Sequence, residues 1–219
     1  MTTIEEPTYI PAAGRDWRLP FYDAMRWAFG AQPLARRLVE AAGPQAGEVV
    51  LDLATGTGAV ALLLAERPGV QVIGVDPDPK ALARAGRKAR RAGVAERIRF
   101  ERGYGQEIPV PDDSVDRVLC ALAFHHLDAE TKDRTLREVG RVLRPGGGLF
   151  VLDFGGHTTG ADGWMARRVM RSELIRGNLG DAIPARMRAA GLTEVGEVES
   201  HVTARMGRVT LWHGAAPRA

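Results

Sequence analysis

Residues 49–65 read VVLDLATGTGAVALLLA, and the pattern of this stretch indicates the fold class of the chain. The apolar run 49–53 carries a single acidic residue, Asp52, which is typical of a buried parallel strand. Residues 54–58, ATGTG, are small enough for the backbone to turn sharply and to approach a ligand closely. The apolar stretch behind them predicts a helix whose first N–H groups are free. A strand, a turn of small residues and a helix together indicate the nucleotide-binding corner of an α/β sheet.

Two classes of cofactor are bound at such a corner. The run GTGAVA, which begins at Gly56, matches the GxGxx(G/A) pattern of dinucleotide sites, and Asp76 follows at the distance of a ribose-binding acid. Asp52 lies four residues before Gly56, where its carboxylate would repel a pyrophosphate. A ligand with a cationic amino group and no phosphate, such as S-adenosylmethionine, would be attracted by the same carboxylate. The stretch alone leaves both cofactor classes open.

The composition excludes several classes of protein. With 219 residues and 45% apolar content, the chain can bury one sizeable core, and one domain is the expectation. No apolar window reaches about eighteen residues, so neither a membrane-spanning helix nor stable membrane insertion is expected. Residues 1–7, MTTIEEP, lack the basic and apolar regions of a signal peptide. Because Cys120 is the only cysteine, a reducing cytoplasm is the expected compartment.

The charge balance says little about partners. Thirty basic residues against twenty-seven acidic ones give a net charge of +3, and the densest basic run spans residues 84–102. We interpret this run as the solvated face of a helix over 80–91 plus the following loop, rather than as a nucleic-acid interface. No Cys and His cluster has metal-ligand spacing. Neither nucleic acid nor a metal ion is therefore expected as a partner, and a homodimer is left open.

Apolar patterns along the rest of the chain predict alternating strands and helices. After the first strand, further strands are expected at 70–75, 98–101, 115–121 and 149–154, with a terminal hairpin of 194–203 and 205–212. Helices are expected between Pro79 and Gly93, at 130–143, 161–176 and 183–190, and as two short helices within 21–42. This order indicates an α/β fold with a doubly wound, mostly parallel sheet and an antiparallel edge.

Four ordered motifs resemble those of one protein family. They are LDLATGTG (51–58), VIGVDPDPKAL (72–82), VPDDSVDRVLCALAFHHL (110–127) and REVGRVLRPGGGLFVLDF (137–154). On these motifs the chain resembles the class I S-adenosylmethionine-dependent methyltransferases, within the ubiquinone/menaquinone-biosynthesis and natural-product small-molecule branch. The resemblance covers residues 49–154, about half of the chain. It implies a Rossmann-like, seven-stranded sheet with an antiparallel last strand and the cofactor S-adenosyl-L-methionine.

The resemblance also implies which residues hold the cofactor. Asp52 and the backbone at three positions of the small-residue turn would bind the methionine part, the three being Ala54, Gly56 and Gly58. Asp76 would accept hydrogen bonds from both ribose hydroxyls, since one carboxylate can accept two charge-assisted bonds.

The adenine side is less regular. Pro77 would pack on the adenine, but Tyr104-Gly105 stands where the family usually has an Asp-Ala pair that bonds the adenine amine. Tyr104 is thus a departure and can stack on the base instead. The backbone at Cys120 would face the methionine end, while its side chain is interpreted as a core cysteine. Tyr22 would come over the cofactor from the N-terminal arm.

Two further residues are candidates for catalysis. His125 follows the fourth strand and Asp153 ends the fifth, so neighbouring parallel strands would bring both to the ligand edge of the sheet. A carboxylate there can bond one imidazole nitrogen and leave the other as a general base. Natural-product O-methyltransferases resembling this chain carry a similar His pair, which favours oxygen as the methylated atom. Proximity alone, with passive histidines, is the competing interpretation.

The expected organisation is a single methyltransferase domain over residues 1–219. It comprises an N-terminal helical arm (1–46), a cofactor-binding core (47–154), a substrate cap (155–190) and a C-terminal hairpin (191–219). In the cap segment, residues 155–190, the helix expected at 161–176 carries an apolar stripe of Trp164, Met165, Val169, Met170 and Leu174. This stripe would either cover the acceptor or pack into the core.

The function expected from the sequence is methyl transfer to a small, partly apolar metabolite, at oxygen. Carbon or nitrogen methylation of a quinone or lipid-like precursor is the alternative within the same class. From other classes, an NAD(P)-dependent oxidoreductase and a non-catalytic binding module compete with it. No Asn/Asp-Pro-Pro-aromatic tetrad follows the fourth strand, which disfavours nucleobase amines as acceptors.

Overall fold

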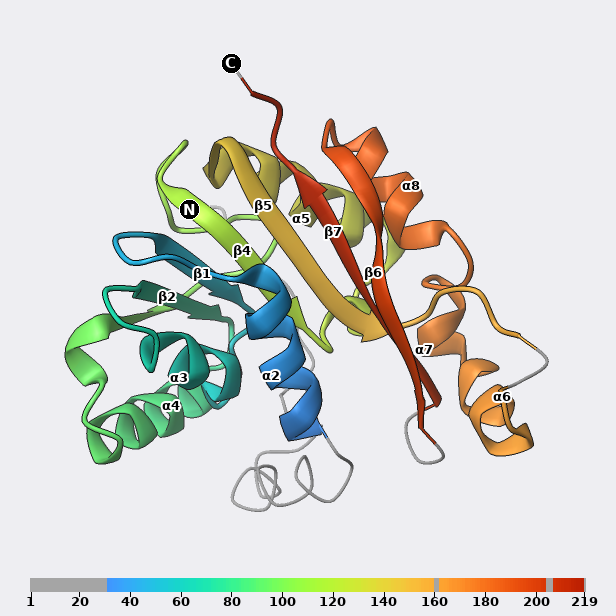
Figure 1. The fold of residues 1–219 in the computed structure, drawn as a ribbon, viewed down its shortest axis with the longest axis horizontal. Helices are drawn as coiled ribbons and strands as arrows, with labels where there is room; N and C mark the ends of the chain where they lie inside the picture. The colour runs from blue at the N-terminus through green and yellow to red at the C-terminus, as the bar shows by residue number, and fades with distance from the viewer. Residues whose placement is uncertain (1–30, 160–161, 204–206, 219) are drawn as a thin grey trace, which may run out of the picture.

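Seven strands form one sheet in the order β3-β2-β1-β4-β5-β7-β6 (Figure 1). The computed structural model describes residues 31–159, 162–203 and 207–218. The strands are β1 (Val49–Leu53), β2 (Gln71–Asp76), β3 (Ile98–Arg102), β4 (Val115–Ala121), β5 (Leu143–Phe154), β6 (Thr193–Thr203) and β7 (Gly207–Ala215). The first five pair in parallel, and β7 runs antiparallel to both of its neighbours. The predicted α/β fold, a mostly parallel sheet with an antiparallel last strand, is confirmed.

The position of β1 explains where a ligand can bind. It pairs with β2 on one side and β4 on the other, so Asp52 lies between Gly74 and Leu119. The chain leaves β1 toward one edge of the sheet and later returns to the opposite side. Such a reversal of strand order opens a crevice at the carboxyl ends of the strands.

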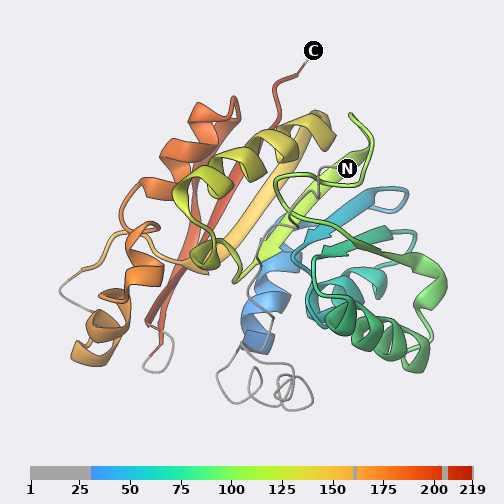
Figure 2. The same ribbon diagram turned by 180° about the vertical axis from the view of Figure 1, so that it is seen from behind.

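Helices cover both faces of the sheet, because successive residues of a buried strand point to opposite sides. They are α2 (Ala31–Ala42), α3 (Ala59–Ala65), α4 (Pro79–Arg91), α5 (Ala129–Val142), α6 (Trp164–Met170), α7 (Glu173–Arg176) and α8 (Ala182–Ala189), with short turns η2 (Ala95–Arg97) and η3 (Phe124–His126). Val50 faces the cluster that contains α2 and α3, and Leu51 faces the one that contains α5 and α8. Figure 1 shows α2 in front of the sheet, and Figure 2 shows α5 on the opposite face. Among the described residues, no helix is long and apolar enough to cross a membrane.

The fifth strand begins earlier than the sequence predicted. Its RPGG stretch pairs with the C-terminal segment: the Gly146 N–H donates to the Ala216 carbonyl (3.2 Å), and the Ala216 N–H donates to the Gly147 carbonyl (2.8 Å). Backbone pairing, which apolar periodicity does not report, extends β5 back to Leu143, which pairs with Val115 of β4.

The single helix predicted over 161–176 is wrong. The chain forms α6 and α7, and Arg171 and Ser172 separate them. Val169 and Met170 approach the start of β7, whereas Trp164 and Leu174 are 68% and 54% exposed. The apolar stripe is thus divided between two directions, because Trp164 lies on the exposed face of α6 and Met170 on its buried face.

Candidate active site

The turn after β1 has the backbone conformation that small residues permit. Ala54, Gly56 and Gly58 have φ values of 58°, 54° and 79°, in the left-handed region. A Cβ atom at Gly58 would come within 2.9 Å of the Ala85 Cβ, so this glycine allows α3 and α4 to pack closely. Ala54 and Gly56 line a cavity, whereas Gly58 does not.

Asp52, on β1, holds this turn by hydrogen bonds. The carboxylate is 1% exposed, and its Oδ2 accepts hydrogen bonds from the Thr55 hydroxyl (2.5 Å) and the Ala61 N–H (2.9 Å). Ala61 lies in the first turn of α3, where a pyrophosphate would require free N–H groups. A buried negative charge at this position disfavours the dinucleotide alternative. Asp52 itself does not line the cavity, and its partners Thr55 and Ala61 belong to the turn and to α3.

Asp76, at the end of β2, joins the turn to the neighbouring strand. Its Oδ2 accepts from the Gly56 N–H (2.7 Å) and its Oδ1 from the Asp78 N–H (2.9 Å). Burial raises the pKa of this carboxyl, and the two N–H donors partly oppose the rise. The residue lines the cavity, and each carboxylate oxygen can accept a further bond from a ligand.

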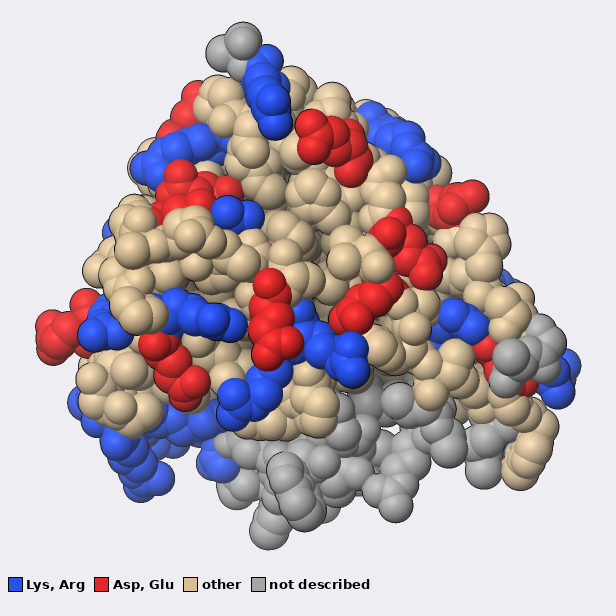
Figure 3. Space-filling view, viewed as in Figure 1, with Lys and Arg blue, Asp and Glu red and all other residues tan. Residues whose placement is uncertain are grey.

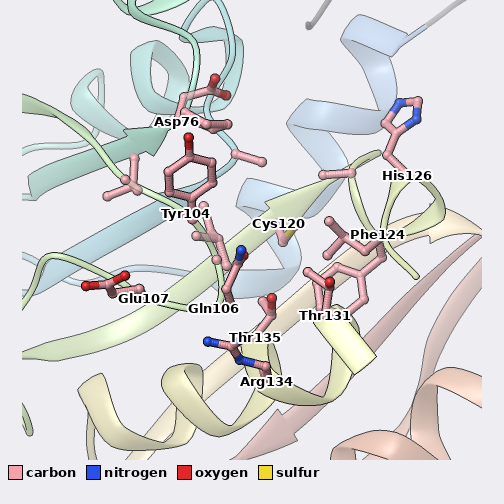
Figure 4. A pocket seen from close by; sticks show the side chains of 18 of the residues that line it. Asp76, Tyr104, Gln106, Glu107, Cys120, Phe124, His126, Thr131, Arg134 and Thr135 are labelled. Carbon is pink, nitrogen blue, oxygen red and sulfur yellow. The ribbon is translucent and has the colours of Figure 1, made fainter. Parts of the chain in front are cut away.

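A cavity of about 490 Å³ lies at the carboxyl ends of the strands (Figure 4). A volume of this size is typical of small-molecule sites. Its walls come from the ends of β1, β2 and β4, the loop after β3 and the start of α5. The residues predicted from the sequence that line it are Ala54, Gly56, Asp76, Pro77, Tyr104, Gly105 and Cys120. Tyr22 lies outside the described residues.

Two buried hydroxyls in the cavity wall have no hydrogen-bond partner among the described residues. They are those of Tyr104, whose hydroxyl points toward Asp76 in Figure 4, and of Thr135 on α5. Thr135 is 1% exposed and packs on Gly105, where a Cβ atom would come within 2.8 Å of its Oγ1. Leaving a buried hydroxyl without a partner costs about 1–3 kcal/mol. The pair therefore fits a bound ligand with polar edges, such as an adenosyl group.

Thr135 was missed by the sequence analysis. A threonine on a helix face next to apolar Leu136 and Val139 looks like packing, and only the contact between α5 and the loop after β3 reveals its position.

His125 and Asp153 meet as predicted. His125 lies in η3, just after β4, and its Nδ1 is 2.7 Å from the Asp153 Oδ1. Asp153 is fully buried and also accepts from the backbone N–H groups of His125 (3.2 Å) and Phe154 (2.6 Å). A carboxylate accepts the Nδ1 proton, so the neutral imidazole keeps Nε2 as its acceptor atom. The His125 side chain remains 10% exposed.

His126, rather than His125, lines the cavity. The rings of the two residues are 3.9 Å apart, and the ring of Phe154 meets His125 edge-on at 4.9 Å. Desolvation, followed by the neighbouring His125, lowers the pKa of His126 to about 4. His126 is therefore neutral at pH 7 and is a weak base.

A buried lysine stands beside this pair. Lys132 of α5 donates its Nζ proton to the Asn178 Oδ1 (2.7 Å), and the Asn178 Nδ2 donates to the Phe154 carbonyl (3.1 Å). Burial lowers the pKa of Lys132, and the nearby Asp153 carboxylate opposes this. The network joins the cap segment to the end of β5. A signal existed in the sequence, because Lys132 occupies the same apolar helix face as Leu136.

Cys120 is a core residue, as predicted. The side chain is 2% exposed, and burial, followed by the charges of Asp153 and Asp52, raises the pKa of its thiol. A protonated thiol is a poor nucleophile. Within the part of the chain that the structure describes, no group of three or more His, Cys, Asp or Glu side chains could hold a metal ion.

Comparisons with known proteins agree with this geometry. Residues 50–147 match a family described as methyltransferase domain. The demethylmenaquinone methyltransferase of Thermus thermophilus is 38% identical over an alignment that covers 80% of this chain and 89% of that protein. The 27-O-demethylrifamycin SV methyltransferase of Amycolatopsis mediterranei is 36% identical over 50% of this chain and 40% of its own length.

A solved structure shows the same fold. The S-adenosylmethionine-dependent methyltransferase from Aquifex aeolicus superposes with a TM-score of 0.64 at 19% identity, covering 83% of this chain and 89% of that one.

The chain spans about half or less of the length of several other curated relatives that it matches, with coverage of 52%, 51% and 40%.

Proposed function

Because the chain belongs to the class I S-adenosylmethionine-dependent methyltransferases, we propose that it methylates an oxygen atom of a small, partly apolar metabolite. The family assignment makes it an enzyme that uses S-adenosylmethionine and acts on a small molecule. That cofactor, when bound, supplies a methyl group activated by a positively charged sulfur. The choice of oxygen rests on the pair His125-His126, which resembles the His pair of natural-product O-methyltransferases. The hydrogen bond between His125 and Asp153 supplies a base that such a reaction would use.

We propose that the cavity binds the cofactor through residues at the end of β2, in the loop after β3 and on α5. Asp76 would accept from the ribose hydroxyls, and Pro77 would pack on the adenine. The hydroxyls of Tyr104 and Thr135 would bond polar atoms of the adenosyl group, which gives the two unpartnered groups a role. Asp52 would act through the turn that it supports rather than by direct contact.

His125 would serve as the general base. Its Nε2 would accept the proton of the acceptor hydroxyl while the oxygen gains the methyl group. Asp153 would hold the ring in the required tautomer and stabilise the resulting imidazolium. A positioned base contributes about 10²–10⁴-fold, and the remaining rate enhancement comes from proximity and orientation. The cap segment, residues 155–190, would border the acceptor.

Methylation of a quinone carbon is the second candidate. The identity of 38% to a demethylmenaquinone methyltransferase favours it. The same histidine could accept a proton in either case, so the proposed base does not separate the two.

One experiment separates oxygen from carbon acceptors. The purified chain would be incubated with methyl-labelled S-adenosylmethionine in a set of separate reactions. Each reaction contains one candidate acceptor: a simple phenol, a glycoside or reduced demethylmenaquinone. We expect label in a product whose NMR spectrum has the methyl shift of an ether. A carbon-bound methyl signal from the quinone, with no labelled ether, would overturn the oxygen assignment. The Asp76→Ala variant, in which cofactor binding should be weakened, serves as the control with reduced labelling.

Removing either unpartnered hydroxyl should weaken cofactor binding without destabilising the protein. We expect Tyr104→Phe and Thr135→Val each to lose about 0.5–1.5 kcal/mol of affinity, the net value of one hydrogen bond. Without cofactor, their midpoints of thermal unfolding should stay equal or rise, because an unsatisfied buried group is removed. Calorimetric titration and thermal unfolding measure the two effects.

The matched control for this pair is Thr193→Val on β6. Its hydroxyl donates to the Ala215 carbonyl at 3.3 Å, away from the cavity. This variant should keep its affinity and lose some stability. Unchanged affinity in both cavity variants would contradict the role proposed for the hydroxyls.

A further inference from the structure

The two short helices of the cap segment present a mixed basic and apolar surface to solvent. On α6, Trp164 is followed at positions three, four and seven residues later by Arg167, Arg168 and Arg171, a spacing that places all four on one helix face. The opposite face is buried through Ala166 and Met170.

The second helix, α7, begins two residues after Arg171 and carries two further exposed side chains of the same kinds. They are Leu174 and Arg176, the last residue of α7. We call these six residues the cap surface: Trp164, Arg167, Arg168, Arg171, Leu174 and Arg176. Glu173 is the only acidic residue between the first and last of them. No ion pair is found for the four arginines among the described residues.

The apolar members of the cap surface are unusually exposed. Trp164 and Leu174 exceed Val198 and Val202 in exposed fraction, and these four are the exposed large hydrophobics among the described residues. Val169 and Met170 pack against the start of β7, so the inner side of α6 is already covered by the protein itself. An indole and a leucine side chain left in water beside four cations indicate a surface that is covered by something anionic and partly apolar.

We propose that the cap surface docks on the surface of an anionic phospholipid bilayer. Tryptophan and leucine side chains partition into the headgroup region, and arginines beside them pair with lipid phosphates. A nucleic acid would pair with the arginines but leave Leu174 uncovered. A second copy of the chain would bring four arginines against four, which electrostatic repulsion opposes.

The other basic surface of the molecule lacks this combination. Figure 3 shows Lys and Arg side chains gathered at the lower left, where Figure 1 places α4. Helix α4 buries Ala81, Ala85 and Ala89 and carries no exposed large hydrophobic residue. It matches the solvated face predicted from the sequence, so the apolar residues single out the cap surface.

Docking in this way would hold the ligand edge near the bilayer. Asn178 follows α7 and donates to the carbonyl of Phe154, the last residue of β5, while the Gly156 N–H donates to the Asn178 carbonyl (3.1 Å). These bonds couple α7 to the end of the strand that carries Asp153. A partly apolar acceptor dissolved in the membrane would then enter without crossing water.

Vesicle binding by the full chain tests the proposal without any knowledge of the acceptor. We expect sedimentation with vesicles of phosphatidylglycerol and phosphatidylcholine in equal parts, weakened by added salt, and little with phosphatidylcholine alone. Replacing Arg167, Arg168 and Arg171 together by glutamine should lower the partition coefficient at least about tenfold, since each arginine adds to the attraction. Trp164→Ala with Leu174→Ser should lower it to a similar degree.

The matched control removes the same charge from α4. Arg87, Arg90 and Arg91, exposed on that helix, are replaced together by glutamine, and vesicle binding should remain within about twofold of the original, because these residues lie outside the cap surface. Trp164→Phe should retain binding but abolish the blue shift of tryptophan emission that vesicles cause. Calorimetric titration with S-adenosylmethionine confirms that each variant is folded, so failure here is distinct from failure of the proposed function.

Three results would overturn the proposal. The first is absence of sedimentation with the anionic vesicles. The second is an equal loss of binding in the α4 variant. The third is undiminished binding in the variant at Trp164 and Leu174, together with comparable binding to duplex DNA, which would make the cap surface a general polyanion site.

Discussion

Replacing His125 by alanine should lower kcat at least a hundredfold at unchanged affinity for S-adenosylmethionine. The proposed base holds its Nδ1 2.7 Å from the buried Asp153 carboxylate, which leaves Nε2 free to accept a proton. Loss of a positioned base costs about 10²–10⁴-fold in rate. The residue does not line the cofactor cavity, so calorimetric affinity for the cofactor should not change.

The pH dependence and a neighbouring variant make this test specific. Activity of His125→Ala should recover in part at high pH, because the acceptor hydroxyl then ionises without a base. His126→Ala is the matched control: the pKa of His126 is about 4, so this ring contributes no base near neutral pH, and its loss should cost less than about tenfold. A drop below about tenfold in His125→Ala as well would leave proximity as the whole mechanism.

Replacing Asp76 by alanine should weaken S-adenosylmethionine binding by about 2–3 kcal/mol, the value of charge-assisted hydrogen bonds to the ribose. The carboxylate also accepts a hydrogen bond from the Gly56 N–H, so its removal takes away a bond that holds the turn as well as the bonds to the ligand. Calorimetric titration measures the loss, and circular dichroism shows whether the fold is kept. Since burial raises the pKa of Asp76, affinity should already decline as the pH falls toward that raised value, where the carboxyl becomes protonated.

Asp78→Ala is the control for this change. Its carboxylate begins α4 by accepting the N–H groups of Lys80 (2.8 Å) and Ala81 (3.3 Å) and does not line the cavity. Loss of such a helix cap costs about 1 kcal/mol of stability, while cofactor affinity should remain. Equal affinities of a folded Asp76→Ala variant and the original protein would refute the ribose assignment.

Local patterns in the sequence were enough to predict the sheet and one wall of the cavity. Buried strands are continuous apolar runs, and the small residues after the first strand have few alternatives to a turn, so both are local properties of the chain. Asp76 is the last residue of β2 and Pro77 is the next residue in the chain. Their position at the cavity could be predicted from the parallel order of the strands alone. The meeting of His125 and Asp153 could be predicted for the same reason, because each follows or ends a neighbouring strand.

Which of several suitable side chains reach the cavity depends on packing between distant segments. Asp52 carries the negative charge that a cationic ligand would require, but its carboxylate accepts a hydrogen bond from the Ala61 N–H in the first turn of α3. His126 lines the cavity while His125 contacts Asp153, a difference of one residue within a short turn. Apolar periodicity predicts which residues share a helix face, but it does not predict which residues elsewhere in the chain that face contacts.

The same limit applies to Thr135 and Trp164. Thr135 became a cavity residue only because α5 packs on the loop after β3, and Trp164 became exposed because α6 packs by its other side, through Ala166 and Met170. Both outcomes depend on contacts between segments far apart in the chain. The sequence carries the local preferences that form each element, whereas the direction of a side chain at an element boundary is set by the long-range packing around it.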